Sequence, residues 1–233
     1  VERSRGLGDV YKRQFWNWLE NELKSESSFL KDEVDFLMRY EFEDPSTYKL
    51  VLEAIAQGNT KLSEIKNFTK LQRTDISPYL RNLNQVGLVE RTVPITENIK
   101  SRKGRYYITD NFLKFWFRYI YPNLSALEEG IFRADEIKED YNSYLGHIFE
   151  EICKQYLIKE QPIKFTQIGK WWFKDREIDI VALNKKTKEI LLMEVKWQDL
   201  NSKDVKKIVA RLQENATHVH WNNKKRKESY GIC

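Results

Sequence analysis

The sequence predicts an α/β protein with two folded units: three short helices and two strands over residues 47–110, then a larger α/β unit over residues 141–233. One observation is a set of three amphipathic stripes with helical spacing, two of them closed by glycine. Another is a pair of alternating apolar runs between residues 177 and 197 that flank a polar turn, as in a β-hairpin. The chain has 233 residues, 41% of them hydrophobic, which suffices for more than one core.

The first unit has the element order of a winged helix-turn-helix. Helical stripes begin at Tyr48 and Leu62, and a third helix runs from Asp75 to Val86. Two β-rich pieces, 88–93 and 105–109, then flank a basic loop. We therefore predict contact with duplex DNA through the third helix and the loop. The alternative is a protein-protein module with a solvated loop. The predicted DNA-binding residues are Arg73, Thr74, Ser77, Arg81, Lys100, Arg102 and Lys103.

The hairpin carries acids where its apolar face ends. A turn centred on Lys186-Thr187 pairs Val181 with Leu192 and Asp179 with Glu194. Facing carboxylates repel each other at Cβ separations of about 5 Å, so a cation between them is expected. Lys196 lies on the face of Glu194. Oxygen ligands beside a lysine are typical of a Mg²⁺ site for phosphodiester hydrolysis. The alternative is a solvated Glu-x-Lys on an exposed hairpin.

The same residues carry a family resemblance. Asp179, followed by Glu194-x-Lys196 after the next strand, resembles the PD-(D/E)XK nuclease superfamily. The blocks IGKWW, EIDIVAL and EVKW, in that order, resemble the nuclease-like C-terminal domain of archaeal-type AAA ATPases. This resemblance implies that Asp179, Glu194 and Lys196 are catalytic and that Glu150, Asp179 and Glu194 hold the metal. On a helical wheel Glu150 and Glu151 lie on opposite flanks of the apolar stripe, so helix geometry does not choose between them. The family's G-x-x-F-E pattern favours Glu150.

The remaining elements of the second unit follow from periodicity. We expect a helix over about 142–159 with Ile152, Cys153 and Tyr156 on its packed face. Strands are expected at 165–169, at 218–221 and from 228 on, with a helix at 205–212. Their α-β-β-β-α-β order fits a restriction-endonuclease-like α/β domain. The basic run 224–227 is expected to be a solvated turn.

The other segments are assigned by composition. Residues 1–14 are typical of translated adapter sequence and are predicted to be a non-native tail. Residues 15–46 resemble the helical remnant of an upstream ATPase module missing from this chain, and the aromatic-rich residues 111–140 are predicted to be a helical connector. The two cysteines lack paired spacing, which disfavours a disulfide framework or a zinc site. No apolar run is long enough to cross a membrane, and a cytoplasmic protein is expected.

Two functions from different classes are consistent with these features. The first is a DNA-binding, Mg²⁺-dependent nuclease-like portion of an archaeal-type AAA ATPase. The second is a non-catalytic regulatory or DNA-docking module of such an ATPase. In either case no G-x-x-x-x-G-K-[ST] motif occurs, so we expect no nucleotide to bind this chain.

Overall fold

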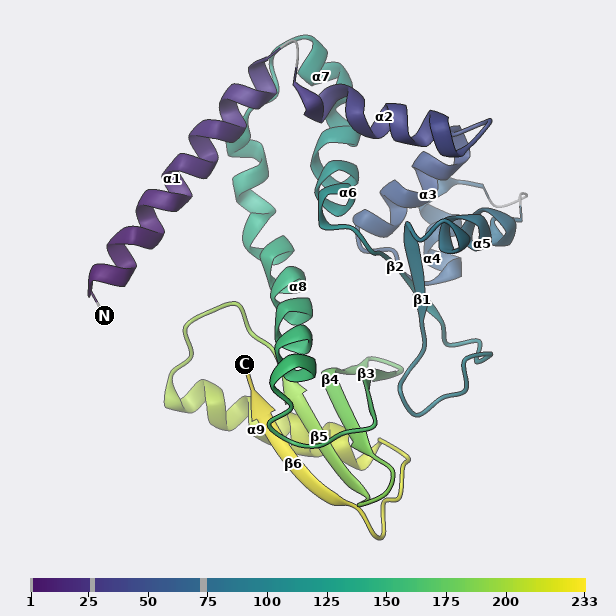
Figure 1. The fold of residues 1–233 in the computed structure, drawn as a ribbon, viewed down its shortest axis with the longest axis vertical. Helices are drawn as coiled ribbons and strands as arrows, with labels where there is room; N and C mark the ends of the chain where they lie inside the picture. Colours follow the sequence, from purple (N-terminus) through teal and green to yellow (C-terminus); the bar gives the residue numbers. More distant parts are fainter. Residues whose placement is uncertain (1, 26–27, 72–74) are drawn as a thin grey trace. The chain divides into compact units, whose positions relative to one another are not determined.

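The computed structural model describes residues 2–25, 28–71 and 75–233, with side chains from residue 11 onward (Figure 1). The chain divides into two compact units. The first comprises the residues up to Arg91 together with Arg105–Asp140. The second comprises Thr92–Gly104 and Tyr141–Cys233. The fold is mixed α/β, with a two-stranded sheet in the first unit and a four-stranded sheet in the second.

The first unit is mainly helical. Asp110 caps the helix α6 (Asn111–Phe115) by accepting the Leu113 N–H, and the helix then continues through a π turn. In that turn Trp116 and Phe117 are fully buried, and the Trp116 indole donates to the Leu30 carbonyl at 2.5 Å. The elements are α1 (Glu2–Lys24), α2 (Phe29–Glu41), α3 (Ser46–Ala56), α4 (Leu62–Thr69), α5 (Ser77–Gln85), β1 (Val89–Thr92), β2 (Arg105–Ile108), α6 (Asn111–Phe115), η1 (Trp116–Ile120), η2 (Tyr121–Asn123) and α7 (Leu124–Glu128).

The predicted order of three helices and two strands is therefore present in residues 46–108. Gly58 and Gly87 follow α3 and α5 with φ of 91° and 78°, the left-handed region that favours glycine after a helix. The helix α1 covers residues 2–14 of the segment that is predicted to be a non-native tail.

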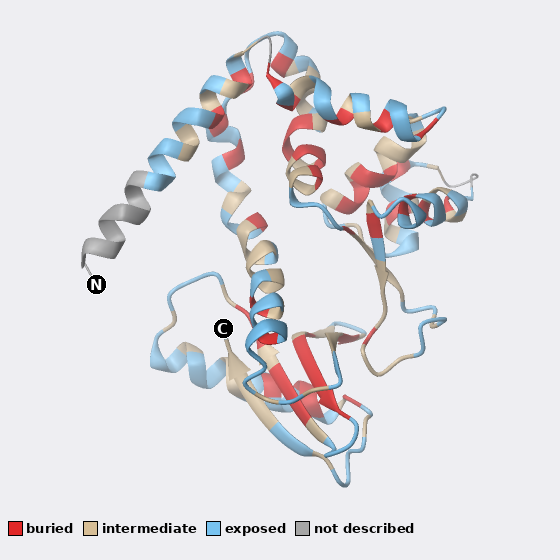
Figure 2. Cartoon of the chain, in the orientation of Figure 1, coloured by how far each residue is buried: buried red, intermediate tan, exposed pale blue. Residues whose placement is uncertain are grey.

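The second unit places helices on both faces of a sheet. α8 (Ala134–Glu160) begins in the first unit and continues into the second. The sheet order is β3-β4-β5-β6, antiparallel except for the parallel pair β5/β6. β4 and β5 are its most buried strands (Figure 2). The elements are β3 (Gln167–Phe173), β4 (Arg176–Asn184), β5 (Glu189–Glu194), α9 (Ser202–Thr217) and β6 (Lys227–Ile232).

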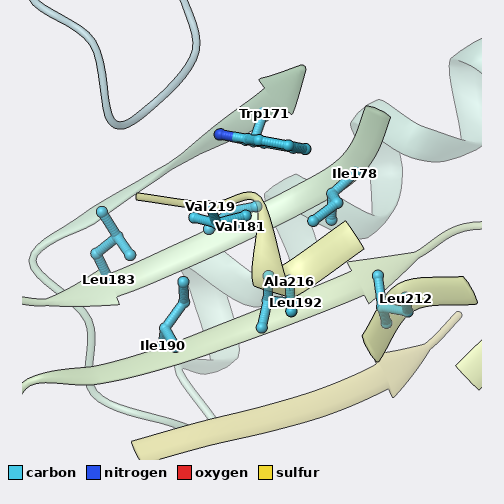
Figure 3. Packing of buried hydrophobic residues seen from close by; sticks show 9 residues of the cluster. All are labelled: Trp171, Ile178, Val181, Leu183, Ile190, Leu192, Leu212, Ala216 and Val219. Carbon is cyan, nitrogen blue, oxygen red and sulfur yellow. The ribbon is translucent and has the colours of Figure 1, made fainter. Parts of the chain in front are cut away.

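Each face of this sheet has its own core. On one face the apolar side chains pack with Leu212, Ala216 and Val219 from α9 and the turn after it (Figure 3). On the other, Cys153 and Leu157 of α8 pack with a second set: Ile180, Ala182, Leu191 and Val195. The hairpin register is the predicted one, because Val181 pairs with Leu192 and Leu183 with Ile190.

Two predictions about this unit were wrong. Residues 218–221 form no strand, since His218 caps α9 and Val219 enters the core. On α8 the residues Ile152 and Tyr156 are exposed, because Cys153 and Leu157, four residues apart, form the packed stripe instead. The run 224–227 begins in an exposed turn as predicted, except that the side chain of Arg226 is only 2% exposed and donates to carbonyls at the end of α9.

Candidate functional site

A β-bulge positions Asp179. Gly169 pairs with Val181 and Trp171 with Ile178, so Asp179 and Ile180 together oppose the single residue Lys170. Ile178 and Val181 consequently face the same core (Figure 3). In a regular strand, whose side chains alternate between the two faces, residues three apart would face opposite sides. A bulge of this kind turns a side chain out of the regular pleat. The Asp179 carboxylate accepts the Val195 N–H at 2.8 Å, just beyond the last hairpin pair, Ile180 with Met193.

Glu194 lies at the end of β5 and is held by two cations. Its side chain is 5% exposed. The ammonium of Lys196 lies 2.8 Å from Glu194 Oε1 and 4.0 Å from Asp179 Oδ2, so it bridges the two predicted carboxylates. The guanidinium of Arg211, from α9, donates to the same Glu194 oxygen. The protein therefore supplies its own cations at the position where a cation was expected.

Glu150 reaches the cluster from α8. Its carboxylate is paired with the ammonium of Lys170, the residue opposite the bulge, and lies 3.4 Å from Nδ1 of His147. Burial opposes ionisation, but the bonds to His147 and Lys170 outweigh it and lower the pKa of Glu150. Neighbouring Glu151 pairs instead with Lys154. Of the two alternatives on the helical wheel, Glu150 is the one that faces the acid cluster.

Asp179 is the least compensated acid of the three. Burial, together with the charges of Glu150 and Glu194, raises its pKa from 3.8 to about 6 despite the Val195 hydrogen bond and the charge of Lys196. The three carboxylates are hard oxygen donors, a set that suits Mg²⁺ in chemistry. In the described part of the chain, however, no three acidic, histidine or cysteine side chains converge as a ready-made metal site. Metal binding would therefore have to displace Arg211 or Lys170.

The predicted DNA-contacting residues lie in separate parts of the fold. Arg73 and Thr74 fall outside the described residues. Ser77 begins α5 and Arg81 is exposed on it. A different side of α5, with Tyr79 and Asn82, and the C-cap residue Val86 line a groove together with acids at the α2–α3 junction: Glu41, Glu43 and Asp44. Phosphates would be repelled from that side, so only the flank with Ser77 and Arg81 suits a phosphate backbone.

The basic loop 92–104 belongs to the second unit and packs along the edge strand β3. The Ile95 N–H donates to the Lys170 carbonyl at 2.9 Å, and the Trp172 indole donates to the Lys103 carbonyl at 3.2 Å. The Lys103 ammonium lies 2.5 Å from Glu97. Lys100 and Arg102 are exposed. The loop thus covers a sheet edge as well as presenting charge.

Sequence reasoning missed two members of the acid cluster. Lys170 lies within the IGKWW block, but its role depends on the bulge, which no periodicity reveals. Arg211 lies on α9, 17 residues after Glu194, and only the tertiary fold brings the two together.

The central part of the chain is similar to one described family. Residues 116–208 match the DUF234 family. Its description is "Archaea bacterial proteins of unknown function". The DUF234 match includes Glu150, Asp179, Glu194 and Lys196 and ends before Arg211.

The chain is also similar to the "Uncharacterized protein MJECL04" of Methanocaldococcus jannaschii, with 56% identity over 202 residues. The match covers 84% of this chain and 46% of that protein, so the chain spans less than half the length of its relative. No solved structure matches. Among the described residues, no helix combines the length and apolarity that crossing a membrane requires.

Proposed function

We propose that this chain is the DNA-binding and nuclease-like portion of an archaeal-type AAA ATPase, with a divalent-metal-dependent phosphodiesterase site at the bulged end of its sheet. The observation that carries the proposal is that Lys196 contacts both Asp179 and Glu194, while the charge of Glu150 from the covering helix acts on Asp179. These are the residues of the D…ExK resemblance together with its helical acid. The ATPase module would lie in sequence outside this chain, and the relative is more than twice as long as its matched segment.

The residues have distinct roles in this proposal. Asp179 and Glu194 would hold the metal, with Glu150 completing the set. The bound metal would supply Lewis-acid polarisation of the phosphate and a more acidic water. The ammonium of Lys196, whose side chain is 30% exposed, can donate a hydrogen bond to a phosphoryl oxygen or to the attacking water. Its pairing with Glu194 fixes its ammonium beside both acids.

DNA binding is proposed for the segment 46–108, whose element order is that of a winged helix. α5 would be the recognition helix, entering the major groove with the flank that carries Ser77 and Arg81. The exposed charges of Lys100 and Arg102 would add phosphate contacts.

The non-catalytic regulatory or DNA-docking module is the second candidate. One specific observation favours it: Glu194 and Glu150 are already neutralised by Arg211, Lys196 and Lys170. A network closed in this way can stabilise a fold without any metal.

Arg211→Gln separates the two candidates. The Arg211 side chain is 58% exposed, so its removal costs little packing, yet it frees a Glu194 oxygen. If Glu194 is a metal ligand, the Mg²⁺ concentration that half-saturates the thermal shift should fall several-fold in the variant. Lys207→Gln, an exposed lysine one turn earlier on α9, controls for net charge.

A nicking assay tests catalysis directly. Supercoiled plasmid is incubated with wild type and Lys196→Met in Mg²⁺ or Mn²⁺. Nicking by wild type alone supports catalysis. If the variant shows no tighter metal response and wild type shows no nicking, the nuclease proposal fails and the regulatory module remains as the function.

A further inference from the structure

The two cysteines lie together beside the acid cluster. Cys153 is buried on α8, and Cys233 is exposed directly after β6. Their Sγ atoms are 2.7 Å apart, although 80 positions separate them in the sequence. This sequence contains no other cysteine, so the contact pairs both thiols of the chain.

The backbone fixes Cys233 in this place. The Cys233 N–H donates to the Glu194 carbonyl at 3.1 Å, and its own carbonyl accepts the Lys196 N–H at 2.9 Å. These bonds continue the parallel β5/β6 ladder past Ile232. On the other side, Cys153 lies three residues after Glu150 and packs in the core that contains Val195. The sulfur pair therefore joins the helix of Glu150 to the strand end of Glu194 and Lys196.

We propose that Cys153 and Cys233 form a reversible disulfide that clamps α8 to the end of the sheet at the candidate active site. The oxidant would be a small-molecule disulfide such as oxidised glutathione. The exposed Cys233 thiolate attacks one of its sulfurs and releases one glutathione thiolate. The Cys153 thiolate then attacks Cys233 Sγ and releases the second. Two protein thiols are oxidised, and one glutathione disulfide is reduced to two thiols.

The environment assigns the order of these steps. Burial and the neighbouring Cys233 raise the pKa of the Cys153 thiol to about 12, so at neutral pH it is a poor first nucleophile. Cys233 is the accessible partner for a reagent in solution. With the disulfide formed, α8 and the β5/β6 end would be joined covalently, and the spacing of Glu150 from Glu194 would be restricted.

Oxidation of the full chain tests the proposal. Wild type and Cys233→Ser are treated with oxidised glutathione, free thiols are blocked with a maleimide, and intact mass and non-reducing peptide maps are recorded. Wild type should form no intermolecular disulfide, lose both free thiols and yield a peptide joining Cys153 to Cys233. Its melting temperature should rise by roughly 5 °C or more and return after dithiothreitol, since the bond closes a long loop. Cys233→Ser should keep one thiol and show no shift.

Cys153→Ala is the second control, because it leaves the exposed thiol and removes its resolving partner. This variant should accumulate a stable glutathione adduct at Cys233, which wild type should resolve. The proposal is overturned if wild type retains two thiols that react with maleimide, or if it ends as the same adduct or as a disulfide-linked dimer. None of these readouts depends on metal binding or DNA cleavage.

Discussion

Replacing Asp179 by asparagine should stabilise the metal-free protein at neutral pH. Its side chain is 15% exposed, and its pKa is raised from 3.8 to about 6. A folded-state pKa above the unfolded one means that the native state holds the proton more tightly, so stability is greatest at low pH and falls as pH rises from about 4 through about 6. The full shift corresponds to about 3 kcal/mol at pH 7.5 and about half of that at pH 5.

The asparagine removes this charge and keeps an oxygen that can accept the Val195 N–H. We expect Asp179→Asn to melt several degrees higher than wild type at pH 7.5, at roughly 2–4 °C per kcal/mol. The advantage should shrink to about half at pH 5 and to about 0.5 kcal/mol near pH 4. Mg²⁺ should raise the melting temperature of wild type and not that of the variant. The assay is scanning calorimetry at the three pH values, with and without Mg²⁺. Asp175→Asn, an exposed acid in the β3–β4 turn, is the matched control.

A lower melting temperature for Asp179→Asn at pH 7.5, equal with and without Mg²⁺, would refute this reasoning. It would mean that Lys196 and the Val195 N–H already compensate the charge fully, so that the ionised aspartate holds the strand end together. A gain that persists unchanged at pH 4 would equally refute it, because the folded-state aspartate is protonated there and most of the charge penalty is gone.

Three further outcomes follow from the fold and the sequence. Lys100→Ala with Arg102→Ala should reduce the slope of log K against log salt for duplex DNA by roughly 0.9 per lost phosphate contact, whereas Lys103→Ala should change it less because Lys103 is paired with Glu97. An unchanged slope would exclude these contacts. No micromolar binding of a fluorescent ATP analogue is expected in equilibrium titrations, since the chain lacks a P-loop motif. Arg226→Met should destabilise the second unit in urea by about 2–4 kcal/mol, because it removes the charged hydrogen bonds that the buried guanidinium donates to the carbonyls of Ala216 and Val219, and a change under 0.5 kcal/mol would contradict that role.

Local patterns in the sequence predict the elements of this chain well where periodicity and turn residues agree. The hairpin register followed from alternation and the polar turn, and Asn184 reinforces it by accepting the N–H groups of Lys186 and Thr187. The residues 218–221 read as a strand because His, Val, His and Trp alternate. Burial of Val219 against the end of α9, with Arg226 binding the nearby carbonyls, requires a turn there instead.

The residues of the candidate site are only partly predictable from local sequence patterns. Asp179, Glu194 and Lys196 are neighbours along a hairpin, so local spacing brings them together. Arg211 and Lys170 enter through tertiary packing and through a bulge. The proximity of Cys153 and Cys233 likewise depends on α8 crossing the end of a parallel strand pair, and linear spacing had suggested no pairing.

The charges of the cluster limit how the site can work. Three carboxylates are matched by the cations of Lys170, Lys196 and Arg211, so the metal-free arrangement is close to neutral. A divalent ion gains little by joining a neutral cluster unless a resident cation leaves. Arg211 is the one best placed to do so, because its side chain is 58% exposed and can be solvated elsewhere, whereas Lys196 is 30% and Lys170 25% exposed. Once released from Glu194, the guanidinium of Arg211 could bind a phosphate group of the substrate. Metal entry and substrate binding would then favour each other, because both require Arg211 to leave Glu194.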